Sequence, residues 1–238
     1  MRRTNTMLTM THRIQVRSLP RPAQVFAMTA LFLAATSLAA QAASNPTKVL
    51  DNSALHPPKG ATVAIVEFSD LECPACAHAN PILKDAAAKY KIPLVRHDYL
   101  IPSHPWSATA AVNARWFDVK GNGLGDAYRD AVFANQSSIY NVSVLAKFTQ
   151  SFAGSHNIAL PFAIDPQNKL AAIVQADNEL GKRTGVVHTP TIFIVMSSSK
   201  GPTYLEVENT DRDLYRTIDQ ALAQTKVAAA PLNHMAKK

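Results

Sequence analysis

The chain has 238 residues, of which 47% are hydrophobic and 17% charged, enough for one ordinary domain with an extension or two small domains. Its formal net charge is +7, but residues 1–42 contain five arginines and no acid, and the rest of the chain has 19 basic residues against 17 acidic ones. Because nucleic-acid binding needs a basic face on the folded domain, this balance argues against nucleic acid as a partner.

The first 42 residues have the pattern of a secretory signal peptide. Arginines precede an uncharged apolar run at 23–40, and Ala40-Gln41-Ala42 has the small-x-small pattern of a cleavage site. We therefore expect cleavage after Ala42 and a mature protein in the periplasm or another extracytoplasmic space. The alternative is an uncleaved N-terminal membrane anchor, because the apolar run approaches the ~20 residues that a spanning helix needs.

An arm and a strand–helix–strand unit follow. Residues 43–60 are polar and rich in proline, which is typical of a linker or leading arm. The β-branched apolar run at 61–68 predicts a buried strand, a helix is expected to begin near Cys73, and IPLVRH at 92–97 predicts a second strand. A connection of this length between two strands implies that they are parallel.

The second half of the chain begins with a helical block. Four stretches in it have helical patterns, with no strand signal between them: 107–117, 125–134, 142–154 and 165–184. Strand signals return at 191–196 and 203–207, and the turn SSSKGP between them predicts an antiparallel hairpin. A last helix is expected over 211–224, with Asp211 as its cap. These elements predict an α/β domain with a helical insertion.

Both cysteines of the chain lie in one Cys-Pro-Ala-Cys motif. Cys73 is expected at the amino end of a helix, where free N–H groups and the helix dipole favour a thiolate, and Pro74 suits the first helical turn. The thiolate is the nucleophile of disulfide exchange, and a lowered pKa also makes this sulfur a good leaving group. Cys76 falls on the same side of the helix, close enough to form a Cys73–Cys76 disulfide. We therefore expect this pair to take part in redox chemistry rather than to stabilise the fold.

Other proteins use the same cysteine spacing differently. A structural zinc site needs four ligands, so it would have to recruit histidines such as His78 and His188. Attachment of c-type haem needs a histidine directly after the second cysteine, where this chain has Ala77. A purely structural disulfide would close a very small loop and contribute little stability. We therefore expect neither a metal nor a cofactor.

Two further positions are candidates for the site. Glu67 ends an otherwise apolar strand, six residues before Cys73. Either it is buried under the cysteines, where desolvation raises its pKa and lets it exchange a proton with Cys76, or it simply faces water. Pro190 precedes the strand at 191–196 and must lie where no ladder N–H is needed; the sequence leaves open whether the bond before it is cis.

The stretch IVEFSDLECPACAHANP, followed far downstream by GVVHTPTIFIV, resembles the DsbA-like branch of the thioredoxin superfamily. The segment LIPSHPWSATAAVNARW resembles the BdbD-like subgroup of that branch, and the resemblance covers about residues 56–224. It implies a thioredoxin fold, with a central mixed sheet flanked by helices and an inserted helical domain. The implied organisation is a signal peptide at 1–42, an arm at 43–60, a thioredoxin-fold core at 61–106 and 185–227, an inserted helical domain at 107–184 and a flexible tail at 228–238.

The resemblance also implies roles for single residues. Cys73 corresponds to the nucleophile, Cys76 to the resolving cysteine and Glu67 to the buried acid below the redox pair. Pro190 corresponds to the cis-proline that faces the disulfide, and Thr189 is expected to present its backbone to a bound substrate strand.

The chain departs from the pattern of DsbA at two positions. Pro74 and Ala75 lie between the cysteines, where DsbA has proline and histidine, and Ala75 cannot donate a hydrogen bond that favours the thiolate. His188 lies two residues before the proline, where relatives often carry glycine. It is expected either to add positive charge near Cys73 or only to narrow the substrate groove.

The expected function is that of an exported dithiol oxidase that introduces disulfides into unfolded or reduced exported proteins. A membrane partner of the DsbB-like or VKOR-like kind would reoxidise it, and the protein is expected to be a monomer. The alternative enzyme is a reductase or isomerase kept reduced by a membrane electron donor. DsbC-type isomerases also have threonine before the cis-proline, but residues 43–60 are too short for their dimerisation domain. A non-enzymatic binding module would function without Cys76.

Overall fold

The computed structural model describes residues 47–198 and 203–229. The predicted signal peptide at 1–42 lies outside these ranges, and so does the predicted tail at 228–238 apart from its first two residues, which belong to the last helix. Among the described residues, no helix is long and apolar enough to span a membrane.

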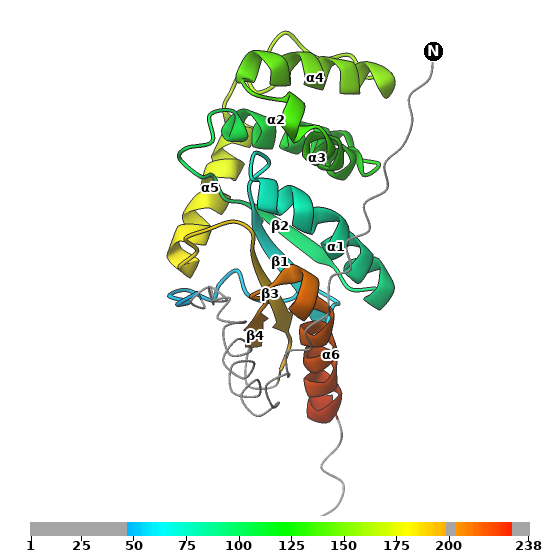
Figure 1. Ribbon diagram of the computed structural model, residues 1–238, viewed down its shortest axis with the longest axis vertical. Coiled ribbons are helices and arrows are strands. Elements are labelled where there is room, and N and C mark those ends of the chain that lie inside the picture. Colours follow the sequence, from blue (N-terminus) through cyan, green and yellow to red (C-terminus); the bar gives the residue numbers. More distant parts are fainter. Residues whose placement is uncertain (1–46, 199–202, 230–238) are drawn as a thin grey trace, which may run out of the picture. The chain divides into compact units, whose positions relative to one another are not determined.

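A four-stranded mixed sheet lies at the centre of the fold (Figure 1). Its strands, in the spatial order β2-β1-β3-β4, are β1 (Val63–Ser69), β2 (Leu94–Asp98), β3 (Thr191–Met196) and β4 (Thr203–Glu206). β1 and β2 are parallel, whereas β3 is antiparallel to both β1 and β4. The parallel pair and the antiparallel hairpin that the sequence predicts are both confirmed.

The helices divide into those that cover the sheet and those inserted between β2 and β3. In chain order they are α1 (Pro74–Tyr90), α2 (Ser107–Lys120), α3 (Leu124–Ala134), the short 3₁₀ helix η1 (Gln136–Ser138), α4 (Val142–Ser155), α5 (Lys169–Thr184) and α6 (Thr210–Ala229). The segment from α2 to α5 contains no strand, so the predicted helical insertion is confirmed (Figure 1).

The middle strand β1 is buried on both faces, because helices cover the sheet on each side. Side chains alternate along a strand, so Val63, Ile65 and Glu67 share one face. Val63 and Ile65 pack there against α1 and α6. On the opposite face, Val66 and Phe68 pack against the leading arm and α5. A strand covered on both faces is apolar along almost its whole length, and this explains the uninterrupted apolar pattern of the sequence.

The inserted helices have a hydrophobic core of their own, centred on Phe117 and Tyr128. The buried side chains of Cys73 and Cys76 belong to this core and not to the two cores that flank the sheet. The redox motif therefore lies at the junction between the insertion and the sheet.

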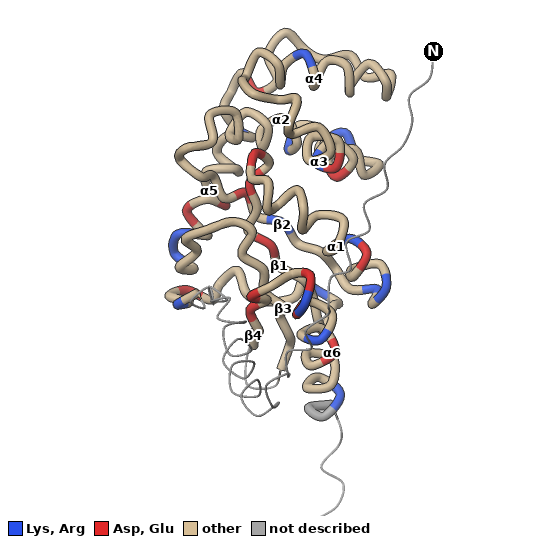
Figure 2. The backbone as a smooth tube through the Cα atoms, viewed as in Figure 1, with Lys and Arg blue, Asp and Glu red and all other residues tan. Residues whose placement is uncertain are grey.

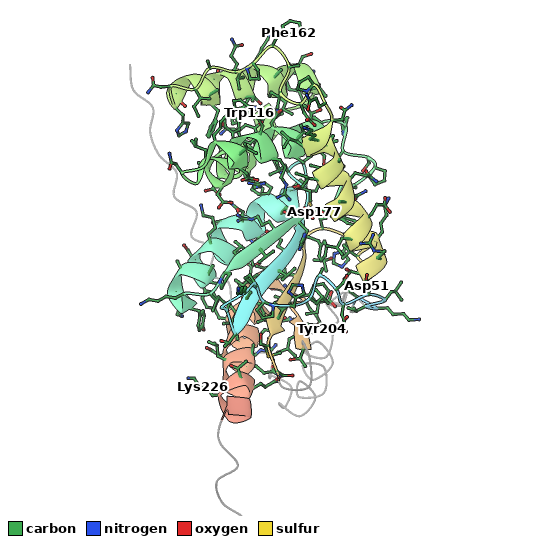
Figure 3. The ribbon with its side chains drawn as sticks, turned by 180° about the vertical axis from the view of Figure 1, so that it is seen from behind. Asp51, Trp116, Phe162, Asp177, Tyr204 and Lys226 are labelled. Atoms are coloured by element: carbon green, nitrogen blue, oxygen red, sulfur yellow. The ribbon has the colours of Figure 1, made fainter. Side chains whose placement is uncertain are left out.

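Ion pairs hold the insertion against β2. Arg115 of α2 donates to Asp98 of β2 (2.7 Å) and to Asp177 of α5 (2.5 Å). Asp177 also accepts a hydrogen bond from His97 of β2 at 2.9 Å. Figure 2 shows charged residues of both signs along β2, α3 and α5, and Figure 3 places Asp177 on α5 beside the sheet.

Two helix starts differ from the sequence prediction. α5 begins at Lys169 and not at 165, because Asn168 adopts a left-handed conformation (φ 54°) that cannot continue a helix. At α6 the cap is Asn209, whose side chain accepts a hydrogen bond from the backbone N–H of Arg212 at 2.9 Å. Asp211, the predicted cap, lies inside the first turn of α6.

Candidate functional site

The redox motif lies at the amino end of α1, directly after β1. Cys73 occupies the N-cap position with extended backbone angles (φ −80°, ψ 121°), and Pro74 is the first helical residue. Proline fits there because the first N–H groups of a helix have no intrahelical acceptor. No side chain caps this end of α1, so the exposed N–H groups and the helix dipole remain available to the Cys73 sulfur.

The two sulfur atoms are in different environments. Both cysteines are free thiols, with Cys73 8% exposed and Cys76 fully buried. A hydrogen bond from the Cys76 thiol, together with the Thr189 side chain and the N–H groups of Cys76 and Ala75, lowers the pKa of Cys73 to about 5, although burial opposes this shift. Burial raises the pKa of Cys76, and the charges of Glu67 and Cys73 raise it further. The pair therefore loses its first proton from Cys73.

The loop before β3 lies against Cys73. The peptide bond between Thr189 and Pro190 is cis, as the family resemblance implies. The Cys73 thiol donates to the Thr189 carbonyl oxygen at 3.4 Å. The Thr189 hydroxyl is buried and has no partner among the described hydrogen bonds, so it is free to donate to the sulfur once Cys73 is a thiolate.

A pocket of about 270 Å³ opens beside this loop. Thr189, Pro190 and Ala75 line it together with His188 and His78. His188 is exposed, and its ring is 3.3 Å from the Thr191 hydroxyl. His78 pairs with Asp211 at 2.9 Å. Within the described ranges, no three His, Cys, Asp or Glu side chains are grouped as a metal site requires.

Glu67 is fully buried below the cysteines, so its alternative placement facing water is wrong. Its Oε2 accepts a hydrogen bond from Arg96 of β2 at 3.2 Å, while Oε1 has no partner among the described residues. Burial raises the pKa of Glu67, and the charge of Arg96 partly counteracts this rise. A buried acid with a raised pKa and a free oxygen is able to hold a proton near Cys76.

The comparisons with known proteins agree with this geometry. The family model described as Thioredoxin matches residues 58–220. The chain belongs to the thioredoxin family. With both cysteines of the motif present, it is a thiol:disulfide oxidoreductase. No curated protein matched the sequence.

Solved structures of the thioredoxin family show the same fold at low identity. DsbA2 of Pseudomonas aeruginosa is 18% identical, with a TM-score of 0.53 over 75% of this chain and 96% of that one. Alpha-DsbA1 of Wolbachia pipientis is 18% identical, with a TM-score of 0.59 over 75% and 94% of the two chains. ScsC of Proteus mirabilis is 20% identical, with a TM-score of 0.54 over 74% and 76%. These matches show that the chain shares its fold with DsbA and ScsC proteins, whereas the narrower BdbD-like assignment stays a prediction.

Sequence reasoning missed the residues that hold the thioredoxin-type site in place. Asp70 N–H donates to Cys76 Sγ at 3.5 Å, and the Asp70 carboxylate accepts from Ile101 N–H (2.8 Å) and the His104 ring (2.9 Å). Glu72 accepts from Trp106 N–H at 2.7 Å. The segment after β2 is thereby attached to the loop before Cys73. The sequence holds no local signal for the contacts with the segment after β2, since those partners lie more than thirty positions away along the chain.

Proposed function

We propose that this protein is an exported dithiol oxidase, which transfers a Cys73–Cys76 disulfide to unfolded or reduced exported proteins. The observation that supports this direction best is the environment of Cys73, which stabilises its thiolate. Whatever stabilises the thiolate stabilises the reduced protein, and a protein whose reduced form is stable is a stronger oxidant.

The low pKa of Cys73 assists its departure more than its attack. At pH 7, a thiol with a pKa of about 5 is almost fully ionised, whereas one at ~8.5 is ~3% ionised, a gain of ~30-fold in thiolate. The intrinsic nucleophilicity of a thiolate falls as its pKa falls, with a Brønsted slope of ~0.4–0.5, and over ~3.5 pKa units this lowers the rate of attack by a comparable factor of ~25–55. The larger thiolate fraction and the lower nucleophilicity therefore cancel when Cys73 attacks. The net effect of the low pKa is that Cys73 is a better leaving group.

The proposed reaction has two exchanges. A substrate thiolate attacks Cys73 Sγ of the disulfide, the Cys73–Cys76 bond breaks, and Cys76 leaves with a proton from Glu67. A second substrate thiolate then attacks the substrate sulfur of the mixed disulfide, and Cys73 leaves as a thiolate. Two electrons pass to the protein, the substrate gains one disulfide, and both cysteines end reduced.

In this proposal the loop beside Cys73 binds the substrate. Thr189 presents its backbone groups to an extended substrate segment. Pro190 leaves this edge of the loop unpaired, so that the substrate segment is able to bind there. Pro74 and Ala75 form the side of the binding surface that belongs to α1. His188 lines the adjoining pocket and narrows it. A DsbB-like or VKOR-like membrane protein would reoxidise the pair, with the protein in the periplasm or another extracytoplasmic space after cleavage at Ala42.

A reductase or isomerase is the second candidate, and Ala75 favours it. An alanine between the cysteines donates no side-chain hydrogen bond to the thiolate, so the oxidising power is smaller than histidine would allow. Such a protein would be held reduced by a membrane electron donor.

Thiol trapping in the native host distinguishes the two directions. We expect the Cys73–Cys76 pair to be mostly oxidised in growing cells, and a mostly reduced pair would support the reductase. In the same assay Cys76→Ser should accumulate mixed disulfides with exported proteins, and Cys73→Ser should form none. If Cys76→Ser turned over like the wild type, the two cysteine roles would be wrong.

A further inference from the structure

A side chain of the helical insertion forms hydrogen bonds with the loop that carries Cys73. Gln136 is the first residue of η1, the 3₁₀ helix between α3 and α4. Its Nε2 donates two hydrogen bonds, one to the carbonyl oxygen of Leu71 at 2.8 Å and one to the carbonyl oxygen of Cys73 at 3.0 Å. We propose that Gln136 is a positioning residue for the Cys73 thiolate, an inference that rests on the proposed redox function.

Both carbonyl oxygens depend on this amide in a specific way. Leu71 is 6% exposed, and its carbonyl oxygen accepts no other hydrogen bond from a described residue. The Cys73 carbonyl oxygen also accepts from Ala77 N–H at 3.1 Å, the first helical hydrogen bond of α1. A carbonyl has two lone pairs, so Gln136 fills the second one without competing with the helix.

Gln136 is itself held in place by its surroundings. Its backbone carbonyl accepts from Ile139 N–H at 3.0 Å, which closes the turn of η1. Phe133 and Ile139, on either side of η1, are buried in the same hydrophobic core as Cys73. The amide therefore approaches the loop from a packed segment and not from a free surface chain.

This placement fixes the direction of the first turn of α1 relative to the sulfur. The Cys76 thiol contributes most to stabilising the thiolate, and the N–H groups of Ala75 and Cys76 in that turn and Thr189 from the cis-proline loop add to it. Hydrogen bonds to a charged sulfur depend on alignment, so a turn that is free to tilt stabilises the thiolate less. Gln136 and Thr189 thus hold Cys73 from two separate segments, and the insertion takes part in the chemistry.

Three substitutions at position 136 separate positioning from packing. Gln136→Met keeps the length but removes the donor, Gln136→Glu places a carboxylate against two carbonyl oxygens, and Gln136→Lys keeps donors and adds positive charge. We expect the pKa of Cys73, measured by the absorbance of the thiolate at 240 nm in the reduced protein, to rise in the order Lys, wild type, Met, Glu. A rise of ~1 unit from about 5 would reduce the thiolate fraction at pH 5 roughly fivefold.

Ser137→Ala, on the same 3₁₀ helix and exposed, is the matched control and should titrate like the wild type. The thermal midpoint of each oxidised variant is recorded beside the titration. The inference is overturned if Met and Glu titrate like the wild type, whatever their stability, because Gln136 would then be only a structural contact. The proposed function fails separately, if wild-type protein with a low Cys73 pKa exchanges no disulfide with a reduced substrate.

Discussion

The reduced protein should lose stability on acidification, because Cys73 is a stable thiolate only in the folded state. Its pKa is about 5 in the fold, against ~8.5 for an unfolded thiol. Since the folded pKa is lowered, the stabilisation is complete above the unfolded pKa and disappears as the pH falls through 5. Linkage gives an upper limit of ~2.7 kcal/mol at pH 7 and almost nothing at pH 4. Solvent screening near the protein surface reduces the expected value to ~1–2 kcal/mol.

Urea unfolding of the reduced protein between pH 4 and pH 8 measures this term. Cys73→Ser does not titrate in this range, so the free energy of unfolding of the wild type should rise relative to that of the variant by ~1–2 kcal/mol from pH 4 to pH 7. Cys76→Ala should gain less than the wild type, because the Cys76 thiol makes the largest contribution to the lowered pKa of Cys73. Parallel pH profiles for wild type and Cys73→Ser would refute the thiolate argument.

Four further predictions test other parts of the molecule. Thr189→Val should raise the pKa of Cys73, seen at 240 nm, because the hydroxyl donor is lost; an unchanged titration would count against it. Glu67→Gln should slow the release of Cys76 from the disulfide, measured by stopped-flow exchange. Because burial raises the pKa of Glu67, this variant should also become more stable relative to the wild type as the pH rises above ~4.5. Gly181→Ala should lower the free energy of unfolding in urea by ~1–3 kcal/mol, since a Cβ there would overlap the Tyr99 ring; a neutral effect would mean that the ring moves freely. Exported protein should begin near Ala43 by N-terminal sequencing, and a start at Met1 would exclude cleavage.

Much of the fold could be predicted because its signals are local. The apolar run of β1 and the TIFIVM strand of β3 have patterns typical of buried strands, and the structure places them within two residues of the prediction. The cysteine motif was recognisable because its chemistry lies within four consecutive residues. Helix starts were less predictable: a left-handed Asn168 delays α5, and Asn209 replaces Asp211 as the cap of α6.

The support of the site could not be predicted, because it consists of contacts between distant segments. Sequence left the burial of Glu67 undecided, and only the packing of α1 over β1 settles it. Arg96 was part of an expected strand, but its contact with Glu67 depends on the register of β2 against β1. Gln136 lies 63 positions from Cys73, and no periodic pattern connects the two.

The reduction potential of the Cys73–Cys76 pair tests the account most directly. Purified protein lacking residues 1–42 is equilibrated in glutathione buffers at pH 7, next to its Ala75→His variant, and the oxidised fraction is measured by thiol alkylation. A stabilised Cys73 thiolate without a histidine donor predicts a potential between ~−270 mV, as in thioredoxin, and ~−120 mV, as in DsbA, with Ala75→His more oxidising than wild type. A wild-type value at or below ~−270 mV would contradict the oxidase.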